Sequence, residues 1–174
     1  VAQLRRARPD LNVVGLRGNV DTRLRKLREG AFDGMVLAMA GLNRLGLGAA
    51  ITHPFDPELM LPAPGQGALA VTIREGDTVA AARVAAVADV RAAAAVSAER
   101  AALHALRAGC HAPVGALALV EGGRVSLRVR LLAPDGSEAL EVTVDGGIGE
   151  TAAMGRRAAE DLLGRGGGRW LATP

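Results

Sequence analysis

The only cysteine of the chain, Cys110, lies in a short loop after an expected helix. It follows Gly109, which ends that helix, and it precedes His111 and the stiffening Pro113. A lone cysteine most often serves as a small buried apolar residue, and that alternative stays open. The negative pole of the helix opposes thiolate formation here, so the setting does not favour a nucleophile that turns over repeatedly. It favours a thiol that reacts once and stays capped, and a redox role is the weaker alternative because no second cysteine could resolve a disulfide.

A group of polar residues surrounds the expected start of a helix near residue 20. Arg17 ends an expected strand, the Gly18-Asn19 turn follows, and Arg23 lies in the first turn of the helix. The helix dipole disfavours a cation there by about 0.3–1 kcal/mol, so Arg23 breaks a local rule. A helix N-terminus surrounded by positive charge suits an anion. Two solvated surface arginines would give the same pattern, and both interpretations stay open.

Two further residues could contact a ligand. Arg44 follows the second expected strand as Arg17 follows the first, and ligands bind at that edge of open α/β sheets. Gln66 stands between Gly65 and Gly67, on backbone that is free to approach a ligand. An exposed surface arginine and a plain Gly-Gln-Gly hinge are the alternatives.

The composition narrows the class of ligand. The net charge is +3, and Lys26 is the only lysine, so the cations are nearly all arginines, whose planar forks suit carboxylates and phosphates. A GC-rich coding sequence would also favour arginine. Aromatic residues make up 2% of the chain, which argues against stacking on nucleic-acid bases.

One cysteine and scattered histidines predict no metal site and no disulfide. No apolar run reaches the ~18 residues of a membrane helix and no secretory signal opens the chain, which predicts a cytoplasmic protein without membrane partners.

In the first half of the chain we expect a βαβ unit. A helix from Asp21 or Thr22 to Gly30 is flanked by two short apolar runs, and a helical stretch covers residues 42–47. This order implies parallel strands with a right-handed crossover. A proline-rich connector and a third apolar run come next. The expected strands of this half are Leu11–Leu16, Gly34–Ala40 and Leu69–Ile73.

In the second half we expect an α+β domain. Two alanine-rich helices, residues 77–88 and 90–107, come first, and a helix over residues 149–163 comes last. Between them, Gly122-Gly123 and Asp135-Gly136 are hairpin turns that join three antiparallel strands. The expected strands are Val114–Val120, Arg124–Leu132 and Ala139–Val144.

The whole chain is predicted to be part of a longer protein. Val1 is not preceded by a methionine, and the first residues have the character of a helix that is ending. One βαβ unit cannot cover both faces of its sheet, so the rest of that domain is expected upstream. The predicted division is a partial α/β domain over 1–61, a connector and strand over 62–88, and a C-terminal α+β domain over 89–174.

Read in chain order, five segments resemble the porphobilinogen deaminase (hydroxymethylbilane synthase) family. They are LRGNVDTRL at 16–24, AMAGLNRLG at 38–46, LPAPGQGA at 61–68, AER at 98–100 and GCHAPVG at 109–115. The resemblance covers most of the chain, and its strength lies in the order of the segments. It implies that the first half is a βαβ unit of a periplasmic-binding-protein-like domain.

The family resemblance also implies an activity. Its members condense four porphobilinogen units into hydroxymethylbilane, with release of ammonia. A dipyrromethane cofactor would be attached by a thioether to Cys110, with Arg17, Gly18, Asn19 and Arg23 around it. Arg44, Arg23 and Gln66 would bind the substrate or the growing oligopyrrole. Charge-assisted bonds from arginine forks to carboxylates are strong, which agrees with these roles.

The resemblance places the catalytic aspartate of the family in its first domain, upstream of residue 1. Asp21 has the position of a helix cap and Asp33 that of a turn residue, so neither is a substitute. We therefore expect no catalytic residue in this chain, and no activity without the N-terminal part of the same enzyme. A two-lobed anion-binding or solute-binding module is the alternative function, although such a protein would not need the Gly-Cys loop.

Overall fold

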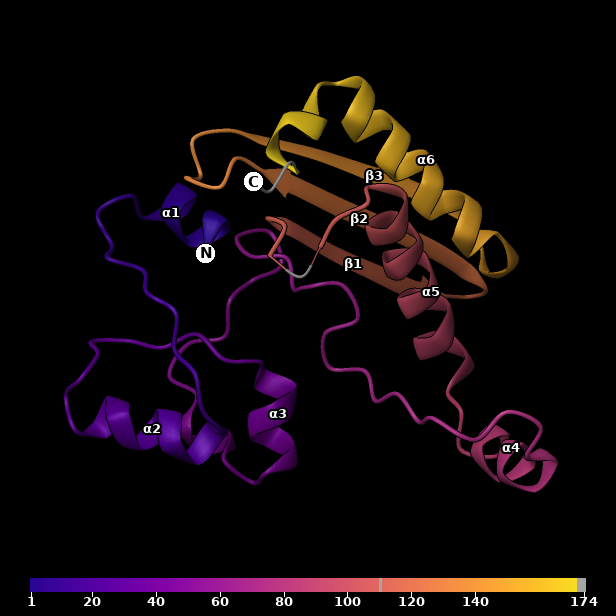
Figure 1. Cartoon of the computed structure of the whole chain (residues 1–174), viewed down its shortest axis with the longest axis horizontal. Helices are drawn as coiled ribbons and strands as arrows, with labels where there is room; N and C mark the ends of the chain where they lie inside the picture. The colour runs from indigo at the N-terminus through magenta and orange to yellow at the C-terminus, as the bar shows by residue number, and fades with distance from the viewer. Residues whose placement is uncertain (110, 172–174) are drawn as a thin grey trace.

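The computed structural model describes residues 1–109 and 111–171, and the second half contains an antiparallel sheet (Figure 1). Strands β1 (Val114–Glu121), β2 (Arg124–Leu132) and β3 (Ala139–Gly147) lie in the order β1-β2-β3. Both pairs are antiparallel, as predicted. Gly122 and Gly123 form the two-residue turn between β1 and β2, with φ of 53° and 77°, a conformation that glycine adopts without strain.

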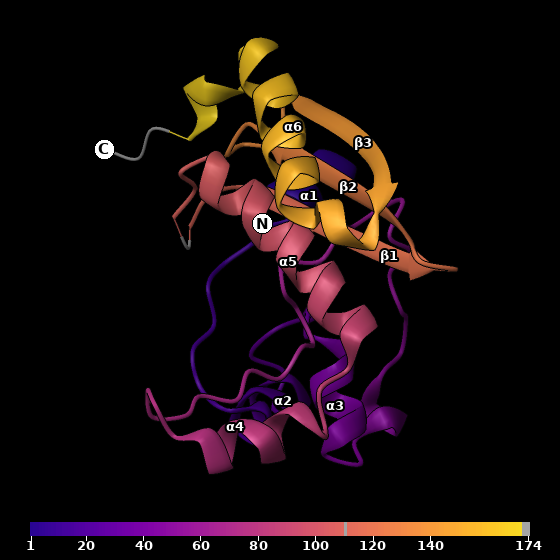
Figure 2. The same cartoon turned by 90° about the vertical axis from the view of Figure 1, so that its right-hand side faces the viewer.

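Helices α5 (Val90–Ala105) and α6 (Thr151–Gly164) cover one face of this sheet, as predicted (Figure 2). Alternate residues of β2 point toward them, because side chains of a strand alternate between its two faces. The fully buried side chains of the resulting core include Leu127, Val129, Leu131, Met154 and Leu162. Gly155 of α6 lies directly against α5, where an added Cβ would come within 2.5 Å of the Ala102 backbone nitrogen, so the two helices approach closely.

The opposite face of the sheet is polar and holds the N-terminal segment. Arg128 and Arg130 of β2 each donate to a different oxygen of Glu141 on β3, both at 2.5 Å. Arg128 also donates to both carboxylate oxygens of Glu58, and Arg130 donates to Oε1 of Gln3 at 2.9 Å. Glu58 and then Glu141 hold the pKa of Arg128 above its usual range. This polar network ties the first sixty residues to the sheet.

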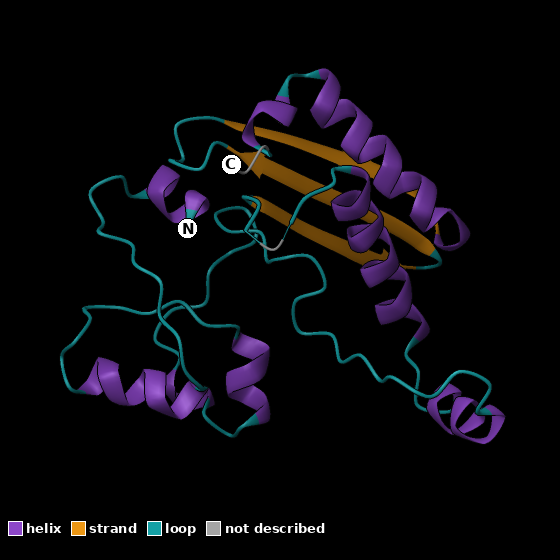
Figure 3. Cartoon of the chain, viewed as in Figure 1, coloured by secondary structure: helices purple, strands orange, loops and turns teal. Residues whose placement is uncertain are grey.

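The first half of the chain contains helices joined by long loops (Figure 3). Helix α1 (Ala2–Ala7) lies near the sheet. Helix α2 (Val20–Arg28) was predicted, but its cap is Asn19 and not Asp21 or Thr22, which lie inside the first turn. Helix α3 (Met39–Arg44) begins earlier than the predicted 42–47, and a 3-10 turn, η1 (Gly48–Ala50), follows it. Helix α4 (Thr78–Ala85) stands apart from the sheet and is capped by Asp77, whose side chain accepts from Ala80 N. A last 3-10 turn, η3 (Gly167–Trp170), packs beside α6; the short η2 turn (Ile148–Glu150) precedes α6.

The prediction of strands in the first half is wrong for this structure. Residues 11–16, 34–40 and 69–73 form no strand, so the expected βαβ unit and its parallel sheet are absent from the described part of the chain. Leu69, Val71 and Ile73 are 73%, 61% and 44% exposed. A strand exists only where a neighbouring strand supplies hydrogen-bond partners, and none of the described segments does so here.

Candidate functional site

The start of α2 brings together the four residues that the sequence singled out there. The side chain of Asn19 caps the helix, accepting a hydrogen bond from Thr22 N at 2.9 Å. The guanidinium of Arg23 folds back, and its Nε donates to the carbonyl oxygen of Gly18 at 2.7 Å. Gly18 has a φ of 125°, which a residue with a Cβ would rarely adopt. The turn is therefore fixed by its own residues.

Two arginines of the predicted site are exposed and available to a ligand. Neither Arg17 nor Arg44 donates a hydrogen bond or forms an ion pair within residues 1–109 and 111–171. Arg25, on the same helix as Arg23, is engaged instead in an ion pair with Glu29 at 2.8 Å. Arg17 and Arg44 thus keep guanidinium groups that could bind a carboxylate, whereas Arg25 is engaged by the protein.

Arg44 is the last residue of α3, and it does not follow a strand as expected. Gln66 is exposed in a loop of two tight turns, closed by hydrogen bonds from Gln66 N to Ala63 O and from Ala68 N to Gly65 O. A Cβ added at Gly67 would lie 3.4 Å from the Cβ of Ala40, so this loop packs against α3. The structure therefore brings Gln66 close to the helix that carries Arg44.

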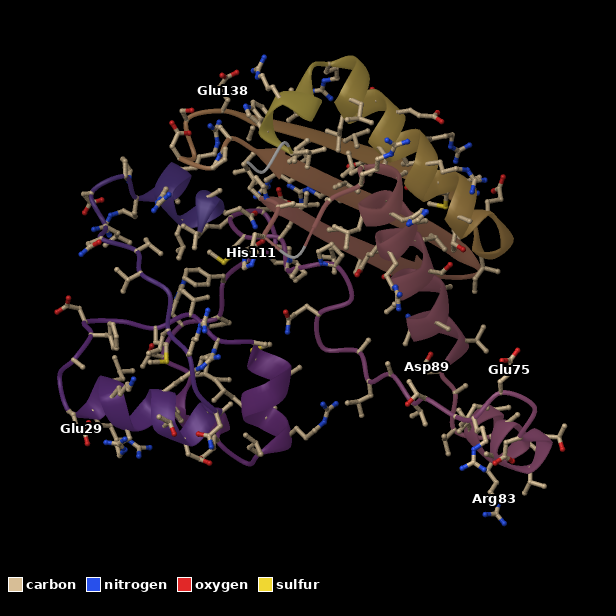
Figure 4. All side chains as sticks on the ribbon, in the orientation of Figure 1. Glu29, Glu75, Arg83, Asp89, His111 and Glu138 are labelled. Atoms are coloured by element: carbon tan, nitrogen blue, oxygen red, sulfur yellow. The ribbon has the colours of Figure 1, made fainter. Side chains whose placement is uncertain are left out.

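Cys110 lies outside the described residues. Its neighbours Gly109 and His111 are exposed, and a turn follows in which Ala112 N donates to Gly109 O at 3.0 Å. Pro113 O accepts from Leu132 N, which ties the end of this loop to β2. Figure 4 places His111 at the rim of the sheet that faces the lobe of α2 and α3.

One polar residue near this site was not predicted as functional. Glu99, in the middle of α5, is only 6% exposed, and its two carboxylate oxygens accept from Gly65 N at 2.6 Å and Ala118 N at 2.8 Å. Burial raises the pKa of Glu99, and the two N–H groups oppose that shift. The signal was present in the sequence, since Glu99 lies three residues before Ala102 and so shares the buried, alanine-rich face of its helix.

Comparison with known proteins agrees with this arrangement. Residues 1–82 match the family model described as porphobilinogen deaminase, dipyromethane cofactor binding domain, and residues 93–164 match the porphobilinogen deaminase C-terminal domain. The chain belongs to the porphobilinogen deaminase family. The resemblance predicted from the five ordered segments is therefore confirmed, and the predicted cofactor agrees with the description of the first matched domain.

Relatives within this family show what share of a family member's length this chain covers. Porphobilinogen deaminases of Roseiflexus castenholzii and Thermus thermophilus are 48% and 49% identical to it, and one of another Roseiflexus strain is 46% identical. Each match covers 98% of this chain but only 56–57% of the relative. In the described parts of the chain, no helix has the length and apolar character needed to cross a membrane.

Proposed function

We propose that this chain supplies the cofactor-attachment and carboxylate-binding parts of a hydroxymethylbilane synthase, a transferase that joins four porphobilinogen units and releases ammonia. The observation that carries this proposal is the arrangement at the start of α2, on a chain that belongs to the porphobilinogen deaminase family. There, an exposed Arg17 stands beside a turn fixed by Asn19 and by the bond from Arg23 to Gly18.

The donor set fits a dipyrromethane group. Each pyrrole unit carries two carboxylates, so cofactor and growing chain present many negative charges to be matched. Arg17 offers a full guanidinium fork, and Arg23 keeps its remaining N–H groups after donating from Nε. Arg44 and Gln66, which share one region through the contact of Gly67 with α3, would bind the incoming or elongated units.

In this proposal Cys110 is the permanent tether. A thioether from its sulfur to a dipyrrole would hold one end of the growing chain while new units are added at the other. When bound, the dipyrromethane group supplies the primer for that elongation. The contribution of the protein is to hold carboxylates with Arg17, Arg23 and Arg44, and to present the attachment loop at the rim of the sheet.

The domain division proposed from the sequence is 1–61, 62–88 and 89–174, with the first part belonging to a periplasmic-binding-protein-like α/β domain. The apolar segments at 11–16, 34–40 and 69–73, the second of which ends inside α3, would become strands when the N-terminal part of the enzyme supplies their neighbours. Catalysis would also need that part, so the isolated chain should not convert porphobilinogen, whereas the complete protein should.

The test is the intact mass of the complete protein and of its Cys110→Ser variant. The wild-type protein should carry a dipyrrole adduct that peptide mapping assigns to Cys110, and the variant should fold but lose the stable adduct. A complete, active protein whose Cys110 titrates as a free thiol would contradict the proposal. A protein that binds anions, carries no adduct and catalyses nothing would support the solute-binding alternative.

A further inference from the structure

Glu99 joins three segments that are far apart in the sequence. It lies on α5, and its carboxylate binds the backbone of Gly65 in the connector and of Ala118 in β1. The group is buried among alanines, and no charged side chain contributes to its pKa. Burying a carboxylate in such a place costs free energy unless its oxygens are hydrogen-bonded, as they are here.

The reason for a carboxylate lies at the edge of the sheet. Among the described strands β1 pairs with β2 alone, so the N–H groups on its other edge need partners. The connector runs along this edge, and Ala116 N donates directly to Pro62 O at 2.9 Å. Further along this edge, neither Gly65 N nor Ala118 N donates to a backbone carbonyl oxygen across the contact between connector and strand.

Two N–H donors cannot bond to each other, so an acceptor must stand between them. A carboxylate supplies one oxygen to each N–H group and thereby completes the contact of connector and strand. Glutamine has only one acceptor oxygen and would turn its amide nitrogen toward one of the donors. The site therefore discriminates between Glu and its closest neutral analogue.

We infer that Glu99 is a positioning residue, which fixes the Gly65–Gln66–Gly67 loop and the adjoining α3 relative to the helix that leads to the Cys110 loop. The chain of contacts is Glu99 to Gly65, then Gly67 to Ala40 of α3, the helix that ends at Arg44. The consequence for elongation rests on the proposed function, since it requires Gln66 and Arg44 to bind substrate. The effect of Glu99 on the position of the Gly65–Gln66–Gly67 loop does not depend on the proposed function.

The first test therefore measures the loop in the 174-residue chain. Hydrogen–deuterium exchange of the peptide covering residues 62–69 should become at least about tenfold faster in Glu99→Gln, because a charge-assisted bond to Gly65 N is lost or weakened. Glu99→Asp keeps the charge but is one methylene shorter, and it should give a smaller increase. The matched control is Val125→Ala, a buried residue of β2 that forms none of the bonds of Glu99. It should raise exchange throughout the sheet instead.

The second test measures elongation in the complete protein. Glu99→Gln should keep the covalent adduct on Cys110, while kcat/KM for porphobilinogen falls by about tenfold or more, since a small misplacement of binding groups has effects of this size. Val125→Ala, compared at a temperature where it is equally folded, should keep its kcat/KM.

Unchanged exchange over residues 62–69 in Glu99→Gln, or the same increase in both variants, would overturn the inference. Failure of the wild-type complete protein to convert porphobilinogen would instead count against the proposed function, and the exchange measurement would still decide the role of Glu99.

Discussion

Charged residues are used in two distinct ways in this chain. Glu99 is buried and satisfied entirely by backbone N–H groups, so its charge serves the geometry of the protein. Arg17 and Arg44 are exposed and form no ion pair with a described residue, so their charge is available to something else. The guanidinium groups of Arg17 and Arg44 therefore remain available for the carboxylate binding proposed for them.

The buried charge of Glu99 should make stability depend on pH. Burial raises its pKa in the folded state above the ordinary value of 4.5, so the folded protein holds this proton more tightly than the unfolded chain does. Glu99 therefore contributes stability that is fully present below pH 4.5 and is lost as the pH rises through the raised pKa. The melting temperature of the wild type minus that of Glu99→Gln, followed by calorimetry from about pH 4 to 7, should fall with increasing pH. A constant difference would contradict this expectation.

Arg17 and Arg23 should matter for ligand binding more than for stability. In the complete protein, Arg17→Ala and Arg23→Ala should reduce cofactor loading or elongation, measured by intact mass and product formation. Their cost in stability should be about 0–1 kcal/mol, with Arg23→Ala at the upper end because it loses the bond to Gly18. Arg25→Ala is the control, because it removes only an exposed ion pair with Glu29. A large drop in melting temperature with normal elongation would identify Arg17 and Arg23 as structural residues.

Sequence patterns were sufficient where the chemistry of a residue depends on its near neighbours. The Gly18-Asn19 turn and the helix after it were predicted, because a turn and the helix that it starts are only a few residues apart, although the cap was expected at Asp21 or Thr22 and is Asn19. The role of Glu99 was not predicted, because its partners Gly65 and Ala118 lie 34 and 19 residues away. The network of Arg130 with Gln3 was missed for the same reason, being formed across 127 residues.

At the scale of elements, the distance in sequence to a partner also explains why the strands of the second half were predicted correctly and those of the first half were not. The strands β1, β2 and β3 follow one another through short turns, so each finds its partner nearby and all were predicted. The apolar segments at 11–16, 34–40 and 69–73 have the same local character, yet no described segment pairs with them. Apolar alternation predicts that a segment can form a strand, whereas the partner decides whether it does.

Core substitutions should show this difference directly. Leu162→Ala, at a fully buried position of α6, should lower the free energy of unfolding of the 174-residue chain by about 2–5 kcal/mol. Leu69→Ala, at a position 73% exposed, should change it by less than about 0.5 kcal/mol. Chemical denaturation followed by circular dichroism would measure both. An equal loss in the two variants would mean that residues 69–73 are packed in solution.

At the scale of the whole molecule, polar contacts connect the N-terminal segment to the sheet. Gln3 donates to Leu61 O and accepts from Leu61 N, and Arg130 joins Gln3 to Glu141. Arg130 also donates to the carbonyl oxygens of Glu58 and Leu59. These bonds add to the burial of Ala2 and Leu61 at the same contact, and several of them depend on the single side chain of Arg130.

Arg130→Ala should therefore release the N-terminal segment more readily than it unfolds the sheet. We expect limited proteolysis to cleave within residues 1–62 several-fold faster, while the fragment that contains the sheet persists, because about 1–3 kcal/mol of hydrogen bonding is lost at that contact. Arg124→Ala, at an exposed position on the same strand, is the control and should leave the cleavage pattern unchanged. Cleavage that begins within β1 to β3 would contradict this division.

The exposed alternation of Leu69, Val71 and Ile73 also has a consequence for the colloidal behaviour of the chain. Residues 67–73 carry no charge and end in the β-branched run Val71–Ile73, so this window can stack on its own copies in cross-β fashion. Arg74 and Glu75, which follow directly, are the charges that oppose such stacking. The solubility limit of the chain would then be set by these few residues, and light scattering should show slower growth of assemblies for Val71→Lys than for the wild type.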